Sequence, residues 1–170
     1  WFSPDPRGVL FFEDLNISRS LKKILKKDHF SIRFNHQFKS VIEACAKAKN
    51  RKGQNSTWIT KEIIKAYTKF HEKGHAYSIE VYNQSDELVG GIYGVILGHY
   101  VSGESMFYIE SNASKVALVK LMEFLHEKGI QWIDTQMVTP IVKNLGGKEI
   151  ERIQFIELLK KSLKNKNSIF

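Results

Sequence analysis

Two carboxylates and one amide interrupt otherwise apolar stretches in the second half of the chain. Glu104 lies in Gly103-Glu104-Ser105-Met106-Phe107, and Asp134 and Gln136 close the run Trp132-Ile133-Asp134-Thr135-Gln136. A charged side chain among β-forming residues is costly to bury unless it has a partner or a function. These three residues are therefore the first candidates for a catalytic site.

The spacing of Asp134 and Gln136 favours amine chemistry. Side chains two residues apart on a strand leave the same face and can converge on one ligand. If the carboxylate accepts a hydrogen bond from the amide nitrogen, it turns the amide oxygen toward a donor such as a protonated amine. Such a pair suits the transfer of a group to an amine. The alternative is a polar pair that closes a strand edge, and the sequence alone leaves that alternative open.

Other chemical signatures are weaker. His71-Glu72-Lys73-Gly74-His75 matches the zinc-hydrolase pattern H-E-x-x-H. However, Gly74 predicts that the helix ends between the two histidines, so they do not share a helical face, and we expect no metal site. The chain has no GK[ST] phosphate loop, and Phe107 replaces the second glycine of a G-x-S-x-G elbow around Ser105. Nucleotide hydrolysis and serine hydrolysis are therefore disfavoured.

Length and composition indicate one basic domain. The chain has 170 residues, 42% of them hydrophobic, and a formal net charge of +8, which favours a polyanionic partner. Its single cysteine, Cys45, is predicted to lie in the core and excludes a disulfide framework. The apolar runs are too short to span a membrane, and no signal peptide is visible. We therefore expect a single domain over residues 1–170 that works in the cytoplasm.

The segment from Ser18 to Lys27 predicts an amphipathic helix. Leu21, Ile24 and Leu25 share its apolar face, while its cationic residues lie largely on the other faces. The cationic residues are Arg19, Lys22, Lys23, Lys26 and Lys27. A phosphate-binding surface and an ordinary solvated face are both compatible with this pattern.

The remaining periodicities predict a mixed α and β chain. Expected strands cover residues 9–12, 30–35, 77–82, 88–97, 99–107 and 130–136, and expected helices cover 38–49, 61–73, 115–128 and 153–163, with a polar loop over 49–56. The strands over 77–107 form an antiparallel meander, and a strand–helix–strand unit follows. This layout predicts an α+β, acetyltransferase-like (GNAT-like) fold, in which helices flank a central, mostly antiparallel sheet.

Acyl-CoA is disfavoured as the donor for such a fold. Acetyltransferases that use it hold the pyrophosphate with a Gly-rich Q/R-x-x-G-x-G/A loop at a helix start. The corresponding stretch here is Glu110-Ser111-Asn112-Ala113-Ser114-Lys115, which lacks that pattern. We therefore expect no CoA cofactor.

Several motifs closely resemble those of bacterial leucyl/phenylalanyl-tRNA protein transferases, in the same order and over nearly the whole chain. They are Ser3-Pro4-Asp5-Pro6-Arg7, Ser18-Arg19-Ser20, Thr57-Trp58-Ile59-Thr60, Gly74-His75-Ala76, Ser78-Ile79-Glu80-Val81, Leu88-Val89-Gly90-Gly91-Ile92-Tyr93-Gly94-Val95, Gly103-Glu104-Ser105-Met106-Phe107, Asn112-Ala113-Ser114-Lys115 and Asp134-Thr135-Gln136. The resemblance implies transfer of Leu or Phe from aminoacyl-tRNA to the N-terminal Arg or Lys of an acceptor protein, which marks that protein for degradation. It implies a monomer that needs no cofactor or metal. The alternatives are an acyl-CoA-dependent N-acetyltransferase and a non-catalytic tRNA-binding module.

The resemblance also implies residue roles. Asp134 and Gln136 are similar to the catalytic pair of the family, Glu104 to its acidic site residue, and Trp58 to the aromatic residue that meets the terminal adenosine. The basic helix would contact tRNA. The apolar amino-acid pocket would be lined by Ile92, Val101, Leu118, Leu121, Leu125, Ile133 and Met137. This chain departs from the family pattern in two places: a Trp-containing segment is missing before Trp1, and Ile141 replaces an expected His.

Overall fold

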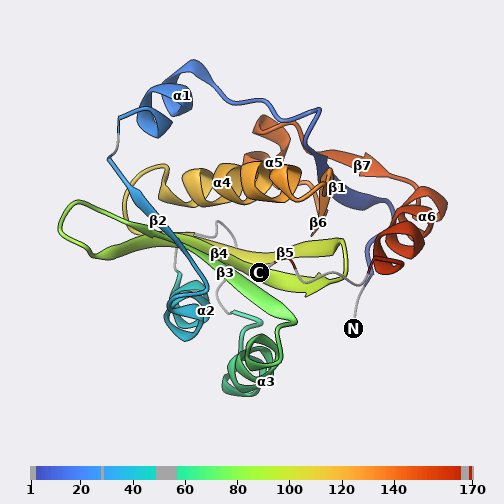
Figure 1. The fold of residues 1–170 in the computed structure, drawn as a ribbon, viewed down its shortest axis with the longest axis horizontal. Helices are drawn as coiled ribbons and strands as arrows, with labels where there is room; N and C mark the ends of the chain where they lie inside the picture. The colour runs from blue at the N-terminus through green and yellow to red at the C-terminus, as the bar shows by residue number, and fades with distance from the viewer. Residues whose placement is uncertain (1–2, 28, 49–56, 166–168, 170) are drawn as a thin grey trace.

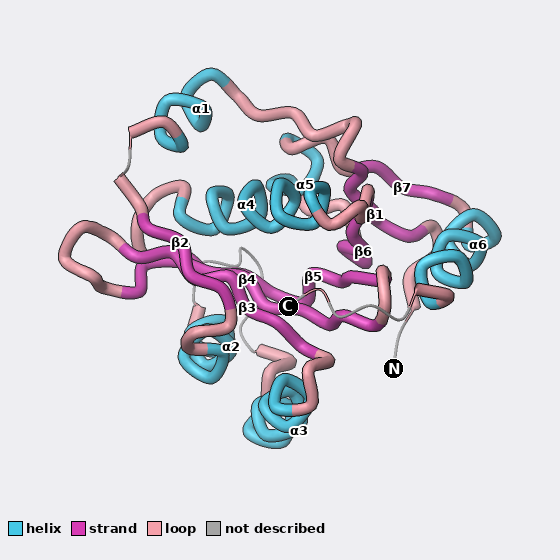
Figure 2. Tube along the Cα trace, in the orientation of Figure 1, coloured by secondary structure: helices cyan, strands magenta, loops and turns pink. Residues whose placement is uncertain are grey.

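A seven-stranded sheet forms the centre of the computed structural model, which describes residues 3–27, 29–48, 57–165 and 169. The spatial order of the strands is β2-β3-β4-β5-β6-β1-β7. Their bounds are β1 Arg7–Phe11, β2 Ser31–Phe34, β3 Ala76–Tyr82, β4 Leu88–Leu97, β5 Tyr100–Tyr108, β6 Trp132–Gln136 and β7 Lys148–Ile150. Figure 2 shows the long strands β3, β4 and β5 in the middle and the short strands β1, β6 and β7 at one side.

One parallel pair joins the two halves of the sheet. The strands β2 to β5 pair antiparallel, as do β6, β1 and β7, whereas β5 and β6 run parallel. Parallel neighbours need a crossover, and the helix α4 (Ala113–Glu127) supplies it. The single register pair between β5 and β6 joins Ser102 and Asp134. The crossover therefore brings two of the sequence motifs side by side.

Helices cover both faces of the sheet. Figure 1 shows α4 across one face and α2 (Phe38–Lys47) and α3 (Lys61–Glu72) across the other. The remaining helices are α1 (Arg19–Leu25), α5 (Pro140–Asn144) and α6 (Arg152–Leu163). The expected α+β fold with a mostly antiparallel sheet is confirmed.

The main core lies between α4 and the sheet. The apolar residues predicted to face inward from this helix are all at most 2% exposed: Val116, Leu118, Val119, Leu121, Met122 and Leu125. Full burial of such a side chain stabilises a fold by roughly 1.5–3 kcal/mol. Cys45 is also buried, at 1% exposure, as expected. The α4 helix packs so closely on β4 that a Cβ at Gly90 would lie 2.4 Å from the Ala113 Cβ.

Local sequence signals determine where most helices and strands end, and pairing between strands determines the others. The α3 helix ends at Glu72, before Gly74 at φ +75°, so the expected break inside the H-E-x-x-H sequence is confirmed. The short helix α5 and strand β7 were not predicted. The β7 strand has three residues and depends on its pairing with β1, which no local pattern reveals. The expected loop over 49–56 lies outside the described residues.

Candidate active site

Asp134 is fully buried and its carboxylate is surrounded by donors. Arg7 donates from Nε at 2.9 Å and from Nη2 at 2.6 Å, which makes a two-pronged ion pair. The hydroxyl of Tyr100 donates at 2.6 Å, and the backbone N–H of Gln136 donates to Oδ1 at 2.9 Å. Such an arrangement compensates the desolvation of the buried charge.

Strand pairing brings Arg7 to this carboxylate. The β1 strand lies antiparallel to β6, and Arg7 is its first residue. The guanidinium carbon lies 4.8 Å from the centre of the Phe155 ring in α6, and Nη1 donates to the Ser3 hydroxyl at 3.3 Å. Only 12% of the Arg7 side chain is exposed. The guanidinium is therefore fixed on one side by Asp134 and on another by an aromatic ring.

Gln136 ends β6 with an unusual backbone. Its φ is +55°, a left-handed conformation that is unfavourable for a residue other than glycine. In the orientation that satisfies its hydrogen bonds, the amide nitrogen donates to the carbonyl oxygens of Gly103 at 3.0 Å and Thr135 at 3.1 Å. The expected hydrogen bond from this nitrogen to the Asp134 carboxylate is not the one formed, because Asp134 binds the Gln136 backbone N–H instead.

Glu104 lies near this pair, on β5. Its carboxylate accepts hydrogen bonds from the hydroxyl of Ser102 at 2.7 Å and from that of Tyr67 at 3.2 Å. Burial raises the pKa of Glu104 above its ordinary value. Burial and the nearby Glu104 charge also raise the pKa of Tyr67, so its hydroxyl stays protonated and keeps donating.

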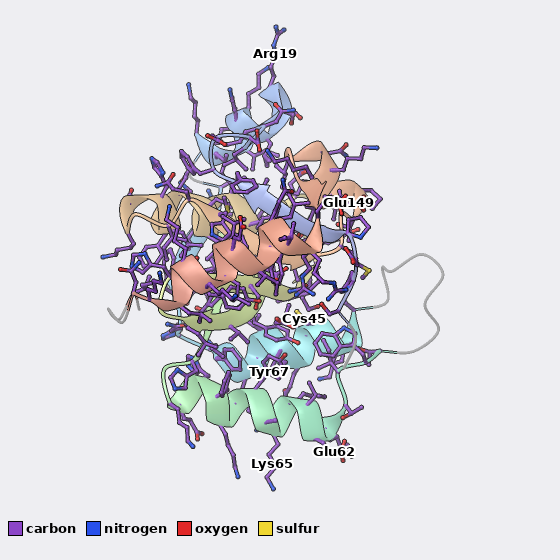
Figure 3. The ribbon with its side chains drawn as sticks, turned by 90° about the vertical axis from the view of Figure 1, so that its right-hand side faces the viewer. Arg19, Cys45, Glu62, Lys65, Tyr67 and Glu149 are labelled. Atoms are coloured by element: carbon purple, nitrogen blue, oxygen red, sulfur yellow. The ribbon has the colours of Figure 1, made fainter. Side chains whose placement is uncertain are left out.

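A cavity of about 420 Å³ opens beside these residues. It is lined by Arg7, Ala66, Tyr67, Phe70, Val95, Tyr100, Ser102, Glu104 and Gln136. The α3 helix supplies two of the aromatic side chains of this wall, Tyr67 and Phe70, and β5 supplies Tyr100. Figure 3 shows Tyr67 on the side of α3 nearer the sheet, whereas Lys65 extends away from it. Glu104 and Gln136 thus line one cavity. Asp134 is not among the lining residues, but its carboxylate binds the Gln136 backbone N–H.

The structure places the other predicted residues elsewhere. The expected amino-acid pocket lies in the core, because Ile92, Val101, Leu118, Leu121, Leu125 and Ile133 are each at most 3% exposed. Met137 is 59% exposed and Trp58 is 43% exposed. None of these residues lines the cavity beside Glu104. Their contacts with substrate stay predictions.

The predicted basic helix is present as α1. Three of the predicted cationic residues, Arg19, Lys22 and Lys23, lie in α1, and Lys26 and Lys27 follow it directly; all five are exposed, whereas Leu21 is buried. Figure 3 shows Arg19 extending away from the body of the molecule. The amphipathic pattern is confirmed, and its role in binding phosphate stays a prediction.

Sequence reasoning missed Arg7, Tyr67 and Tyr100. Arg7 belongs to the Ser-Pro-Asp-Pro-Arg motif, which supports the family resemblance but assigns no role to this arginine. A usable signal was the alternation of Tyr100, Ser102 and Glu104, which places three polar groups on one face of β5. No comparable signal connects Arg7 to Asp134, because they lie 127 residues apart.

Neither a metal cluster nor a membrane-spanning helix is present in the part of the chain that the structure describes. Within residues 3–27, 29–48, 57–165 and 169, no three His, Cys, Asp or Glu side chains are grouped so that they could hold a metal ion. In that part of the chain, no helix is both long and apolar enough to cross a bilayer.

Within the described residues, the mostly antiparallel sheet, its parallel β5–β6 pair and the flanking helices define an acetyltransferase-like (GNAT-like) fold. The solved structure of L-PGS from Bacillus licheniformis aligns with 79% of this chain and 45% of its own chain, at a TM-score of 0.52 and 12% identity. A GNAT-family acetyltransferase from Staphylococcus aureus Mu50 aligns with 59% of this chain and 69% of its own, at a TM-score of 0.43 and 15% identity.

Sequence comparison narrows this class to one family. The model of the leucyl/phenylalanyl-tRNA protein transferase family matches residues 9–160. The transferase of Flavobacterium johnsoniae is 47% identical over 160 residues, which cover 94% of this chain and 74% of that protein. The transferase of Shewanella sp. W3-18-1 is 46% identical over 159 residues, covering 94% of this chain and 66% of that protein. The chain belongs to the leucyl/phenylalanyl-tRNA protein transferase family.

Proposed function

We propose that this chain transfers Leu or Phe from aminoacyl-tRNA to the N-terminal Arg or Lys of an acceptor protein, and so marks it for degradation. Family membership supports the reaction class. The observation that supports the site assignment is that Glu104 and Gln136 line one cavity, and that Asp134 binds the backbone N–H of Gln136. We further expect the enzyme to act as a monomer in the cytoplasm.

The chemistry requires little beyond positioning and proton transfer. The donor is an activated ester, so the amine nitrogen of the acceptor attacks its carbonyl carbon, the C–N bond forms and the C–O bond to the tRNA breaks. The amine loses a proton, and the released ribose oxygen gains one. Holding the two substrates in reactive geometry lowers the barrier, and a positioned proton acceptor lowers it further. No redox group or cofactor enters this balance.

Gln136 is the proposed contact with the attacking amine. Its amide oxygen accepts a hydrogen bond from the amine and favours loss of the proton. Asp134 acts through Gln136, because its carboxylate is already occupied by Arg7, Tyr100 and the Gln136 N–H. In this proposal Asp134 fixes the backbone that presents the amide and does not take the proton itself.

Glu104 is the proposed recognition group for a cationic acceptor. Arg7 is neutralised by Asp134, whereas Glu104 is bound by the hydroxyls of Ser102 and Tyr67. The charges at the cavity therefore sum to one negative charge when Glu104 is ionised. The rings of Tyr67 and Phe70 line the same cavity and offer faces for a guanidinium or ammonium group. An acceptor that begins with Arg or Lys suits this combination.

The tRNA contacts in this proposal lie outside the cavity. The exposed cations of α1 contact phosphates, and the exposed ring of Trp58 meets the terminal adenosine. The Leu or Phe side chain enters the apolar region that the resemblance assigns to Ile92 and its neighbours. Opening that region requires movement of side chains that are now packed in the core.

Acyl-CoA remains the less favoured donor. In acyl-CoA enzymes, free N–H groups at the start of a helix hold the pyrophosphate. Here the N–H of Ala113 donates to the Glu110 carbonyl at 3.2 Å, and Ala113 packs against Gly90. A non-catalytic tRNA-binding module would keep α1 but lack transfer activity.

A transfer assay tests the proposal. Leu-tRNA and Phe-tRNA are incubated with peptides that begin with Arg, Lys or Ala, and product is followed by mass spectrometry. We expect product with the Arg and Lys peptides only. Binding of charged tRNA without any product would support the non-catalytic module, and product from acetyl-CoA in place of tRNA would support the acetyltransferase.

A further inference from the structure

The contacts of Asp134 come from three separate parts of the chain. Arg7 lies on β1, Tyr100 on β5, and the Gln136 N–H at the end of β6. Both carboxylate oxygens are used, with Arg7 Nε and the Gln136 N–H on Oδ1 and with Arg7 Nη2 and Tyr100 on Oδ2. The position of the carboxylate is therefore set by Arg7 and Tyr100.

The Gln136 backbone is strained and has a local hydrogen bond that stabilises it. A φ of +55° is unfavourable for glutamine, and such conformations persist where surrounding contacts enforce them. The Gln136 N–H donates to Asp134 Oδ1 at 2.9 Å. Because Asp134 is itself fixed by Arg7 and Tyr100, these two residues control the conformation that directs the Gln136 side chain to the cavity wall.

We propose that Arg7 and Tyr100 are positioning residues for the transfer reaction, which act through Asp134 to hold Gln136 in its left-handed conformation at the cavity. This inference rests on the proposed transferase function. Arg7 supplies a planar fork that matches the carboxylate, and Tyr100 supplies one further donor. Burial, together with the Asp134 charge, raises the pKa of Tyr100, so the hydroxyl remains a donor throughout the neutral range.

The two contacts differ in how much of the geometry they fix. Lysine at position 7 would keep the charge but lose the paired donors, so Arg7→Lys is not a conservative change at this site. We expect it to lower kcat by about 10²-fold, the size of effect that a small misplacement of a reacting group produces. Tyr100→Phe removes a single hydrogen bond to a charged group, and we expect a decrease in kcat of about tenfold.

Matched controls come from the surface of the same chain. Tyr108→Phe changes an exposed tyrosine on the same strand as Tyr100, outside the cavity lining. Arg152→Lys changes a half-exposed arginine whose Nε lies 3.1 Å from Asp5. Exposed ion pairs contribute little, so Arg152→Lys should keep the kcat of the unaltered enzyme. Tyr108→Phe should keep it because this exposed side chain lies outside the cavity lining.

The experiment measures kcat and KM for charged tRNA and for an Arg-starting peptide in all four variants, with thermal unfolding to confirm folding. A positioning role predicts a fall in kcat with little change in the KM for charged tRNA. The exchange of the Gln136 amide hydrogen is followed by NMR on isotope-labelled protein. We expect faster exchange in Arg7→Lys and Tyr100→Phe than in the unaltered enzyme.

The outcomes separate this inference from the proposed function. Unchanged kcat together with unchanged exchange at Gln136 in a folded Tyr100→Phe variant would overturn the inference, even though the enzyme is an active transferase. If the unaltered enzyme transfers nothing, the proposed function fails. The exchange measurement then still decides whether Arg7 and Tyr100 hold the Gln136 backbone.

Discussion

Two carboxylates, Asp134 and Glu80, are both 0% exposed, yet their surroundings differ. Glu80 lies on β3 and accepts from the backbone N–H groups of His36 and Gln37 at 3.2 Å each, and from the Ser78 hydroxyl at 2.5 Å. These donors are neutral: the two N–H groups lie directly before α2, and the Ser78 hydroxyl lies on β3 itself. Asp134 is bound by a guanidinium, a tyrosine hydroxyl and the Gln136 N–H, and all three of these residues line the cavity.

The difference shows that burial of a charge does not by itself identify a catalytic group. Glu80 accepts from the N–H groups of the N-cap residue Gln37 and of the residue before it, and a negative charge at this helix start interacts favourably with the helix dipole. That role is structural and complete without a substrate. Asp134 also has a full set of donors, but its donors belong to residues that line the cavity, and one of them is the backbone of Gln136. We therefore expect loss of Glu80 to affect folding and loss of the Asp134 contacts to affect chemistry.

The largest expected effect is on the transfer rate. Gln136→Ala removes the amide oxygen that we place against the attacking amine, and positioned proton transfer of this kind contributes roughly 10²- to 10⁴-fold. We expect kcat to fall within that range while the affinity for charged tRNA stays nearly unchanged. Single-turnover transfer with saturating charged tRNA measures the rate, and a binding titration measures the affinity. A rate equal to that of the unaltered enzyme would remove Gln136 from the chemistry.

The exposed lysines in and directly after α1 are expected to affect tRNA binding and not the chemical step. Replacing Lys22, Lys23, Lys26 and Lys27 together with Ala should weaken tRNA binding and leave transfer at saturating tRNA intact. Each lysine that contacts a phosphate contributes roughly 1 to the slope of log affinity against log salt. Titrations at several salt concentrations compare the slopes of the two proteins. An unchanged slope would make α1 an ordinary solvated helix.

Replacing Glu80 should lower the stability of the fold and leave the transfer rate unchanged. Glu80→Gln weakens the acceptor for two backbone N–H groups, so we expect a loss of about 1–3 kcal/mol in the free energy of unfolding. Urea unfolding measures this loss, and transfer at saturating substrates should keep its rate. Tyr108→Phe, on an exposed side chain, serves as the stability control. A large fall in rate with unchanged stability would reverse the roles of the two carboxylates.

The smallest expected effect is the contribution of Glu104 to the pH dependence of stability, which is separate from its proposed role in binding the acceptor. Burial raises its folded-state pKa above the ordinary value of 4.5, so the fold favours the protonated form. The associated stabilisation is fully present below the unfolded-state pKa and is lost as the pH rises through the folded-state pKa. Glu104→Gln has no such proton, so its stability relative to the unaltered enzyme should increase across that window. Unfolding midpoints at a series of pH values test this, and parallel curves would contradict it.

The sequence predicted the features that depend on local patterns. The 3.6-residue periodicity identified α3 and α4, and alternation with turn residues identified the meander of β3, β4 and β5. Gly74 correctly predicted the end of α3. Glu104, Asp134 and Gln136 stood out because polar residues interrupted apolar strands, and two of them do share one cavity.

The sequence could not predict contacts between distant segments. Arg7 and Asp134 are 127 residues apart, and Tyr100 and Asp134 are 34 residues apart, so no local pattern shows that they meet. The Asp134–Gln136 contact is local, but it was predicted through the wrong atoms. Strand alternation assumes extended backbone, and the left-handed conformation of Gln136 departs from it. Glu80 was passed over because its N–H partners are recognisable only once α2 packs beside β3.

The coupling between Asp134 and Gln136 gives the most direct test of the central claim, that these two residues act as one catalytic unit. Transfer rates at saturating charged tRNA are measured for Asp134→Asn, Gln136→Ala and the double variant. Members of one unit are not additive, so the double variant should lose far less than the product of the two single losses. Fully multiplicative losses, or an unchanged rate in Asp134→Asn, would show that the Asp134–Gln136 pair is structural and that other residues carry the chemistry.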